Sequence, residues 1–361
     1  MRFIDEYRNK DLVEKLSAKI KSATTKAWTI MEVCGGQTHA ILKYNLFEYL
    51  PDKVEFIHGP GCPVCVTPIE LIDKAIAISL QKNVILTSYG DMLRVPGSEM
   101  DLFQARAKGA DVRIVFSPLD AVKIAVENPL KMVVFFAVGF ETTAPANAMS
   151  LIEARRRNLT NFSLLAAHVL VPPAIEAVLN AENSRIQGFI AAGHVCTVMG
   201  YQQYMPLAQK YKVPIVVGGF EPVDLMQAVY ELVLQLEAGS CDVINAYSRV
   251  VTPEGNLHAK KTIETVFEVT DQKWRGIGLI PNSGLKINPD FEAFDAEKIF
   301  SIQDTKISES EHCMAGLVLQ GHMKPTQCKA FSNLCTPENP LGAPMVSSEG
   351  ACAAYFHYHK T

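Results

Sequence analysis

Nine short apolar runs constrain the fold of this chain more than any other feature. They lie at 28–33, 54–57, 84–87, 112–116, 132–138, 163–169, 188–192, 214–217 and near 243–251. Continuous apolar runs of this length are typical of parallel strands that are covered on both faces, and the helical stretches between them suit crossover connections. The sequence therefore predicts an α/β protein with open, mostly parallel sheets.

The 361-residue chain is longer than one hydrophobic core usually spans. We predict an N-terminal helix over 1–26, which packs on the first domain, and two Rossmann-like domains over 27–147 and 148–255. The turn at 138–141 resembles the one at 218–221, which indicates two related halves that face a cleft. Over 256–361 cysteines are frequent and strands are hard to identify, so we expect a smaller iron–sulfur region there.

Charge and hydropathy exclude two classes of partner. Lys and Arg number 34 and Asp and Glu 38, so no broad basic surface for nucleic acid or anionic membrane is expected. No leader-like segment opens the chain, and no apolar stretch approaches the roughly 20 residues that span a bilayer. The sequence predicts a cytoplasmic protein, in which nine cysteines suit metal binding or thiol chemistry better than structural disulfides.

A Cys-x-x-Cys pair follows the second apolar run. A Gly-Pro-Gly turn at 59–61 places Cys62 and Cys65 at the carboxyl edge of that strand, where open α/β sheets bind ligands. Two intervening residues let both sulfurs meet in one disulfide or on one ion, so the pair is a redox dithiol or part of a metal site. The turn and Pro63 favour a rigid, exposed loop over two buried, inert cysteines.

Cys34 lies at the end of the first apolar run and precedes two glycines, which let a ligand approach its sulfur. If the first two strands are neighbours, Cys34, Cys62 and Cys65 open into one crevice, and three thiols suit a soft metal such as iron or zinc. His39 could tune or protonate this site, although a histidine near a helix start is at least as often a structural cap.

Four further cysteines, Cys313, Cys328, Cys335 and Cys352, are separated by 14, 6 and 16 residues. Four thiolates can hold either tetrahedral zinc or an iron–sulfur cluster. Zinc ribbons usually show two Cys-x-x-Cys knuckles, which this set lacks. The wide spacing slightly favours an iron–sulfur cluster, and zinc remains an alternative.

Polar residues also follow the fifth and the seventh apolar runs. Glu141 and His194 could each be an acid or a base in the cleft. A glutamate that begins a helix is more often simply a favourable charge in its first turn. Cys196 and Cys241 stand outside both cysteine sets and are interpreted as small buried hydrophobic residues. No glycine-rich turn forms a nucleotide-binding motif.

The ordered motifs of this chain resemble the HypD family of hydrogenase maturation proteins, which help to build the iron centre of nickel–iron hydrogenases. The resemblance rests on residues 34–39, 59–65, 139–143 and 193–195 and on the C-terminal cysteine set, and it covers the chain from about residue 27. Gln37 stands where some members carry histidine, and Cys196 where serine is common. Neither departure touches the seven key cysteines.

This resemblance implies an accessory scaffold with redox function. Iron, as an Fe(CN)2CO assembly intermediate, is expected at Cys34 with a small HypC-type partner, while HypE supplies cyanide and works with HypF. A [4Fe-4S] cluster is expected on Cys313, Cys328, Cys335 and Cys352. Its electrons are expected to reach the iron through the Cys62/Cys65 dithiol, which could also ligate iron. The sequence does not fix the oligomeric state, and we expect a monomer that works in a heteromeric complex.

The sequence is also compatible with two other functions. One is a free-standing iron–sulfur thiol-disulfide oxidoreductase, which would work without partner proteins and in which Cys34 is incidental. The other is a zinc-stabilised α/β binding protein with no redox role. A colourless protein that contains zinc and no sulfide would favour the latter.

Overall fold

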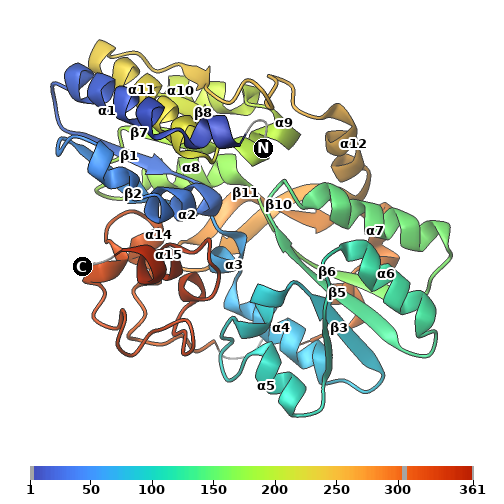
Figure 1. Cartoon of the computed structure of the whole chain (residues 1–361). Helices are drawn as coiled ribbons and strands as arrows, with labels where there is room; N and C mark the ends of the chain where they lie inside the picture. Colours follow the sequence, from blue (N-terminus) through green and yellow to red (C-terminus); the bar gives the residue numbers. More distant parts are fainter. Residues whose placement is uncertain (1–3, 303–306, 360–361) are drawn as a thin grey trace.

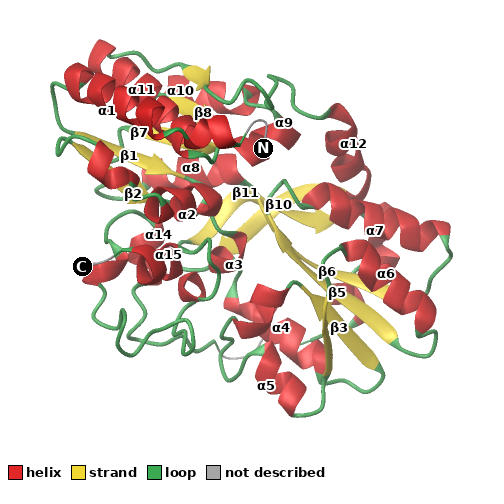
Figure 2. Ribbon diagram, in the orientation of Figure 1, coloured by secondary structure: helices red, strands yellow, loops and turns green. Residues whose placement is uncertain are grey.

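The computed structural model describes residues 4–302 and 307–359, and its strands form two sheets (Figures 1 and 2). The first sheet has the order β2 (Val54–His58), β1 (Trp28–Glu32), β7 (Gly188–Ala192), β8 (Ile215–Gly218) and β9 (Val243–Asn245), all parallel. The second has the order β10 (Phe267–Trp274), β11 (Gly278–Ile287), β6 (Phe162–Val169), β5 (Met132–Gly139), β3 (Val84–Ser88) and β4 (Asp111–Ile114). In the second sheet only β10 and β11 run antiparallel to their neighbours. The predicted α/β class with mostly parallel sheets is confirmed.

The parallel strands of the two sheets share one order. Counted along the chain within each sheet, the second strand lies beside the first, and the third and fourth follow on the other side of the first. Each sheet therefore changes its direction of growth beside its first strand, as Rossmann-like sheets do, and in such sheets ligands bind at this point, at the carboxyl ends of the strands. In the first sheet, β1 and β7 flank this switch point.

Neither sheet is built from one continuous stretch of chain. The first takes β1 and β2 from the predicted domain 27–147 and β7 to β9 from 148–255. The second takes strands from both of these and adds β10 and β11 from the segment after residue 255. The strands thus do not divide at residue 147. Strands pair through backbone hydrogen bonds, which do not depend on the side chains, and the apolar runs suit a sheet covered on both faces in either position.

Helices cover both faces of each sheet, and side chains that alternate along a strand serve opposite cores. On β1, Ile30 packs with α1 (Lys10–Ala23), α2 (Gly35–Lys43) and α11 (Pro222–Ala238). The next residue, Met31, belongs to the core with α8 (Val171–Asn180), α9 (Gly193–Met199) and α10 (Met205–Tyr211). The second sheet is covered by α4 (Ile69–Ser79) and α5 (Leu102–Ala107) on one face and by α6 (Pro118–Glu127), α7 (Ala144–Arg156) and α12 (Leu257–Val266) on the other.

The N-terminal helix is shorter than the predicted span of 1–26, of which residues 1–3 lie outside the described part. A 3-10 turn over Asp5–Arg8 precedes α1, which buries Val13, Leu16 and Ile20 against α11 and the first sheet. Within the described residues, no helix is both long and apolar enough to cross a membrane.

The segment after residue 255 begins with structure that the sequence analysis did not identify. It forms α12 and the β10–β11 hairpin, followed by α13 (Ala296–Ile299). The remainder is mostly loop, with α14 (Ala315–Leu319) and α15 (Ala351–Tyr358) (Figure 2). This loop-rich part packs against α2 through Leu42, Ala354 and Tyr355. In Figure 1 it lies beside α3 (Pro63–Val66), which sits between the two sheets.

Candidate functional site: three groups of cysteines

Cys34 lies at the switch point of the first sheet. It follows β1, precedes α2, and is 1% exposed. His194 follows the neighbouring strand β7, and its Nδ1 lies 3.5 Å from the Cys34 sulfur. The sequence analysis named both residues but did not pair them, because 160 residues separate them and only the strand order makes them neighbours.

Burial keeps both of these groups neutral. It raises the pKa of the Cys34 thiol and lowers the pKa of His194 to about 4. The ring of Phe220 lies 5.1 Å from the His194 ring and forms an apolar wall beside the pair. A neutral imidazole and a thiol that can lose its proton to a metal are suitable ligands for iron or zinc.

The loop that carries Cys62 packs directly on the backbone of Cys34. The strands β1 and β2 are parallel neighbours, as the sequence analysis expected for a shared crevice. The amide of Gly35 donates to the carbonyl of Gly61 at 2.7 Å. A Cβ atom at Gly61 would overlap the backbone of Cys34, so this close approach requires glycine.

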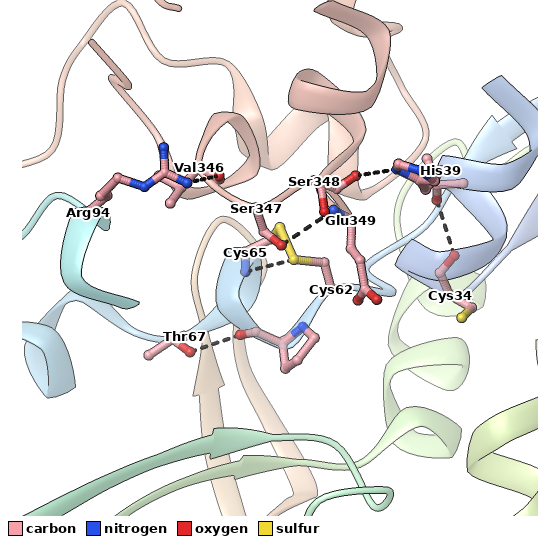
Figure 3. Close-up of a disulfide and its surroundings, with 12 residues drawn as sticks. Cys34, His39, Cys62, Cys65, Thr67, Arg94, Val346, Ser347, Ser348 and Glu349 are labelled. Atoms are coloured by element: carbon pink, nitrogen blue, oxygen red, sulfur yellow. Dashed lines mark hydrogen bonds between the residues drawn. A yellow bond between two sulfur atoms is a disulfide. The ribbon is translucent and has the colours of Figure 1, made fainter. Parts of the chain in front are cut away.

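Cys62 and Cys65 form a disulfide across α3 and are buried, with 3% and 0% exposure. The predicted exposed loop is therefore wrong. The cover comes from the C-terminal region: residues 347–349 pass over the disulfide (Figure 3), and Ala343–Met345 packs on α3. Arg94 donates to the carbonyl of Val346 at 3.0 Å and holds this cover in place. This segment lies about 280 residues after Cys65, so the residues around the Cys-x-x-Cys motif could not reveal that the pair is covered.

The three thiols do not form a site for one ion in this structure. Within residues 4–302 and 307–359, no three His, Cys, Asp or Glu side chains are grouped to hold a metal ion. Cys62 and Cys65 are bonded to each other, while Cys34 faces His194 in the same core. Iron ligation by Cys62 and Cys65 stays a prediction.

His39 faces the C-terminal cover. Its Nδ1 lies 3.1 Å from the carbonyl oxygen of Ser348 (Figure 3). Its ring centroid lies 5.0 Å from that of Tyr358. These contacts agree with the structural alternative considered for this histidine. Among the described interactions, His39 makes no direct contact with the Cys34 sulfur. Its role in tuning the thiols stays a prediction.

A buried chain of hydrogen bonds ties the strand ends to the helix that carries Cys352. The carboxylate of Glu32, at the end of β1, lies 2.7 Å from Nδ1 of His58, at the end of β2. The other ring nitrogen of His58 lies 3.2 Å from the hydroxyl of Tyr355 on α15. This chain was not predicted, although an ionisable side chain at the end of each of two apolar strands is a signal that could have revealed it.

The four C-terminal cysteines line one apolar cavity. Its walls include Cys313, Cys328, Cys335 and Cys352 together with Val318, Phe331 and Met345. Burial raises the pKa of Cys352, and the other three cysteines raise it further because thiolates so close together repel one another. Cysteine thiols around one apolar cavity are the ligand type that an iron–sulfur cluster takes, although within the described residues no three of them are grouped to hold a metal ion in this structure.

Glu141 is almost completely buried behind β5. One carboxylate oxygen accepts a hydrogen bond from the amide of Val171, at the first residue of α8, at 2.9 Å. The other oxygen has no partner among the described residues. Burial raises the pKa of Glu141 from 4.5 to about 7. Because the folded state holds the proton more tightly, the stability that Glu141 contributes is complete below pH 4.5 and is lost as the pH rises through 7.

We expect Glu141→Gln to flatten this pH dependence, because the amide keeps the acceptor for Val171 and cannot ionise. Between pH 5 and pH 8 the free energy of unfolding of the parent should fall by about 1–3 kcal/mol more than that of the variant. Urea unfolding at both pH values measures this difference. The exposed Glu182→Gln should follow the parent. Identical profiles for the parent and Glu141→Gln would show that this carboxyl titrates normally.

The fold and the site thus define an α/β protein with three groups of cysteines: Cys34, the Cys62–Cys65 disulfide and the four C-terminal thiols. Comparison of the sequence with known proteins identifies the family to which the chain belongs. The family model HypD, described as the hydrogenase formation hypA family, matches residues 10–359. The chain belongs to this family of hydrogenase formation proteins, which confirms the resemblance noted in the sequence.

Curated relatives match along almost their whole length. The hydrogenase expression/formation protein HupD of Azotobacter chroococcum mcd 1 is 47% identical over 367 residues, which are 99% of this chain and 97% of that protein. The hydrogenase maturation factor HypD of Escherichia coli (strain K12) is 46% identical over 368 residues, 100% of this chain and 99% of the relative. The factor of the same name from Rhodobacter capsulatus is 45% identical over 370 residues, with 99% and 98% coverage.

Proposed function

We propose that this chain is the scaffold on which the Fe(CN)2CO centre of a nickel–iron hydrogenase is assembled, with the iron as its cargo. The observation that carries the proposal is the Cys34 thiol that faces the His194 imidazole at 3.5 Å at the switch point of the first sheet. Iron that displaces the thiol proton would gain a thiolate and a neutral imidazole. Its other positions remain for cyanide, carbon monoxide and a ligand from a small HypC-type partner.

The neighbouring dithiol suits the delivery of cyanide. We propose that HypE, working with HypF, brings cyanide as a thiocyanate on one of its cysteines. Breaking that sulfur–carbon bond takes two electrons and leaves a thiolate and a cyanide ion, which binds the iron. Reduced Cys62 and Cys65, as one thiol and one thiolate, supply two electrons as they close to a disulfide and release one proton. The packing of Gly61 on Cys34 supports this assignment, because it holds the dithiol loop against the iron-binding segment.

The C-terminal cysteines complete the proposed redox path. Cys313, Cys328, Cys335 and Cys352 would hold a [4Fe-4S] cluster, which when bound supplies electrons one at a time. Cys65 and Cys313 line one small pocket, and this shared pocket supports a route between the two groups. The burial of Cys62 and Cys65 favours an internal redox role over a free-standing oxidoreductase, whose dithiol must reach an external substrate.

We expect Cys34→Ala to lower nickel–iron hydrogenase activity to background in a host that lacks its own family member, because the iron loses its thiolate. The double variant Cys62→Ala with Cys65→Ala should do the same, since no dithiol remains to supply electrons. The matched control is Cys241→Ala, a half-buried cysteine outside all three groups, which should support parental activity.

Hydrogenase activity in cell extracts, with immunoblots for the amount of each variant, measures these effects. Parental activity with Cys34→Ala would show that the iron is held elsewhere. Parental activity with the double variant would remove the dithiol from the electron path and leave the scaffold.

A further inference from the structure

The turn of the β10–β11 hairpin lies between the disulfide and the C-terminal cysteines. The amide of Arg275 donates to the carbonyl of Val66, which directly follows Cys65, at 2.8 Å. On the other side, Gly276 packs against Gly316 of α14, so closely that a Cβ atom on either residue would overlap the other. The turn therefore contacts both α3 and the segment that follows Cys313.

The side chain of Arg275 is held by hydrogen bonds to two other segments of the chain. Its Nε donates to the carboxylate of Glu309 at 2.8 Å, and its Nη1 donates to the carbonyl of Pro96 at 3.0 Å. The arginine side chain is only 9% exposed, whereas that of Glu309 is 45% exposed. Arg275 and Glu309 line the small pocket that Cys65 and Cys313 share. A largely buried cation thus lies beside the disulfide, with a more exposed carboxylate as its counter-charge.

We propose that Arg275 is a positioning residue that sets the reduction potential of the Cys62–Cys65 couple, and that Glu309 opposes its effect. The inference deepens the proposed function, on which its role in maturation rests. Reduction breaks the sulfur–sulfur bond, takes two electrons and one proton, and leaves one thiol and one thiolate. The electrons come from the proposed cluster in the working protein and from a small dithiol in the experiment below.

The sign of the effect follows from the charges. The disulfide is neutral and the reduced pair carries one negative charge, so a nearby cation stabilises only the reduced form. Burial strengthens this interaction, because water screens it less. Glu309 partly cancels the cation and therefore favours the oxidised form.

The experiment equilibrates the full-length protein with buffers of reduced and oxidised dithiothreitol at a fixed pH. The state of Cys62 and Cys65 is then read by alkylation and mass spectrometry of the peptide that contains both. We expect Arg275→Gln to lower the ratio of reduced to oxidised pair about tenfold, which corresponds to about 30 mV for a two-electron couple. Glu309→Gln should raise the ratio about threefold. Arg275→Lys keeps the charge and should stay close to the parent.

Opposite shifts distinguish electrostatic tuning from loosening of the hairpin, which both substitutions would cause in the same direction. The matched controls are Arg185→Gln and Glu55→Gln, which break a surface pair with a contact of 2.8 Å outside this pocket and should shift nothing. Shifts of equal sign, no shift, or a pair that stays oxidised in every buffer would each overturn the inference. The readout follows only the Cys62–Cys65 peptide, so it remains decisive even if Cys34 proves dispensable for maturation.

Discussion

Anaerobically purified protein is expected to be brown and to contain about four irons and four acid-labile sulfides per chain, and Cys328→Ala is expected to lose most of both. The physical reason is the cavity that all four C-terminal cysteines line, where close thiolates repel one another unless a positive centre binds them. Removing one thiolate leaves an incomplete ligand set and an apolar gap. Metal and sulfide analysis with an electronic spectrum measures the loss.

The control for this experiment is Cys241→Ala, which removes a thiol outside the cavity and should leave the iron and sulfide content unchanged. One zinc and no sulfide in the parent would contradict the prediction. The C-terminal region would then be held by a structural metal, and the proposed source of single electrons would be absent.

Gly61→Ala is expected to reduce the free energy of unfolding by about 3 kcal/mol or more. The added Cβ would lie on the backbone nitrogen and Cα of Cys34, and backbone atoms cannot rotate away as the end of a side chain can. The two cysteine segments must then separate, which also breaks the hydrogen bond from Gly35 to Gly61. Urea unfolding measures the loss.

Gly90→Ala is the matched control, because a Cβ there meets only the side chain of Ile114 at ordinary contact distances of 3.8 and 4.0 Å. Its unfolding free energy should lie within about 1 kcal/mol of the parent. A Gly61→Ala protein as stable as this control would show that the Cys62 loop can move away from Cys34 at little cost. The loop would then not be a fixed partner of the iron-binding segment.

The parallel strands were predictable because they are buried on both faces. Runs such as 132–138 and 188–192 are apolar throughout and match β5 and β7 within a residue or two. The β10–β11 hairpin was missed, because β10 is buried only at its two ends and carries exposed or half-buried residues between them. Strand pairing was not predictable either: β1 joins β7, which lies far along the chain, and a local pattern holds no information about a distant partner.

The candidate site was predictable where it depends on neighbouring strands. The proximity of Cys34 and the Cys62 loop was predicted on the condition that their strands are neighbours, and β1 and β2 meet that condition. The pairing of Cys34 with His194 and the approach of Arg275 to Cys65 depend on the sheet order and on the hairpin, and neither could be read from the motifs. The burial of the disulfide likewise depends on a segment that no local pattern connects to it.

The covering of the disulfide by residues 347–349 has a consequence for the order of events during synthesis. This segment leaves the ribosome after every strand of both sheets, so the sheets can form before their cover exists. Until it docks, Cys62 and Cys65 remain open to solvent and to whatever thiols and oxidants surround the nascent chain. The docking of α15 through Tyr355 and His58 then closes the compartment.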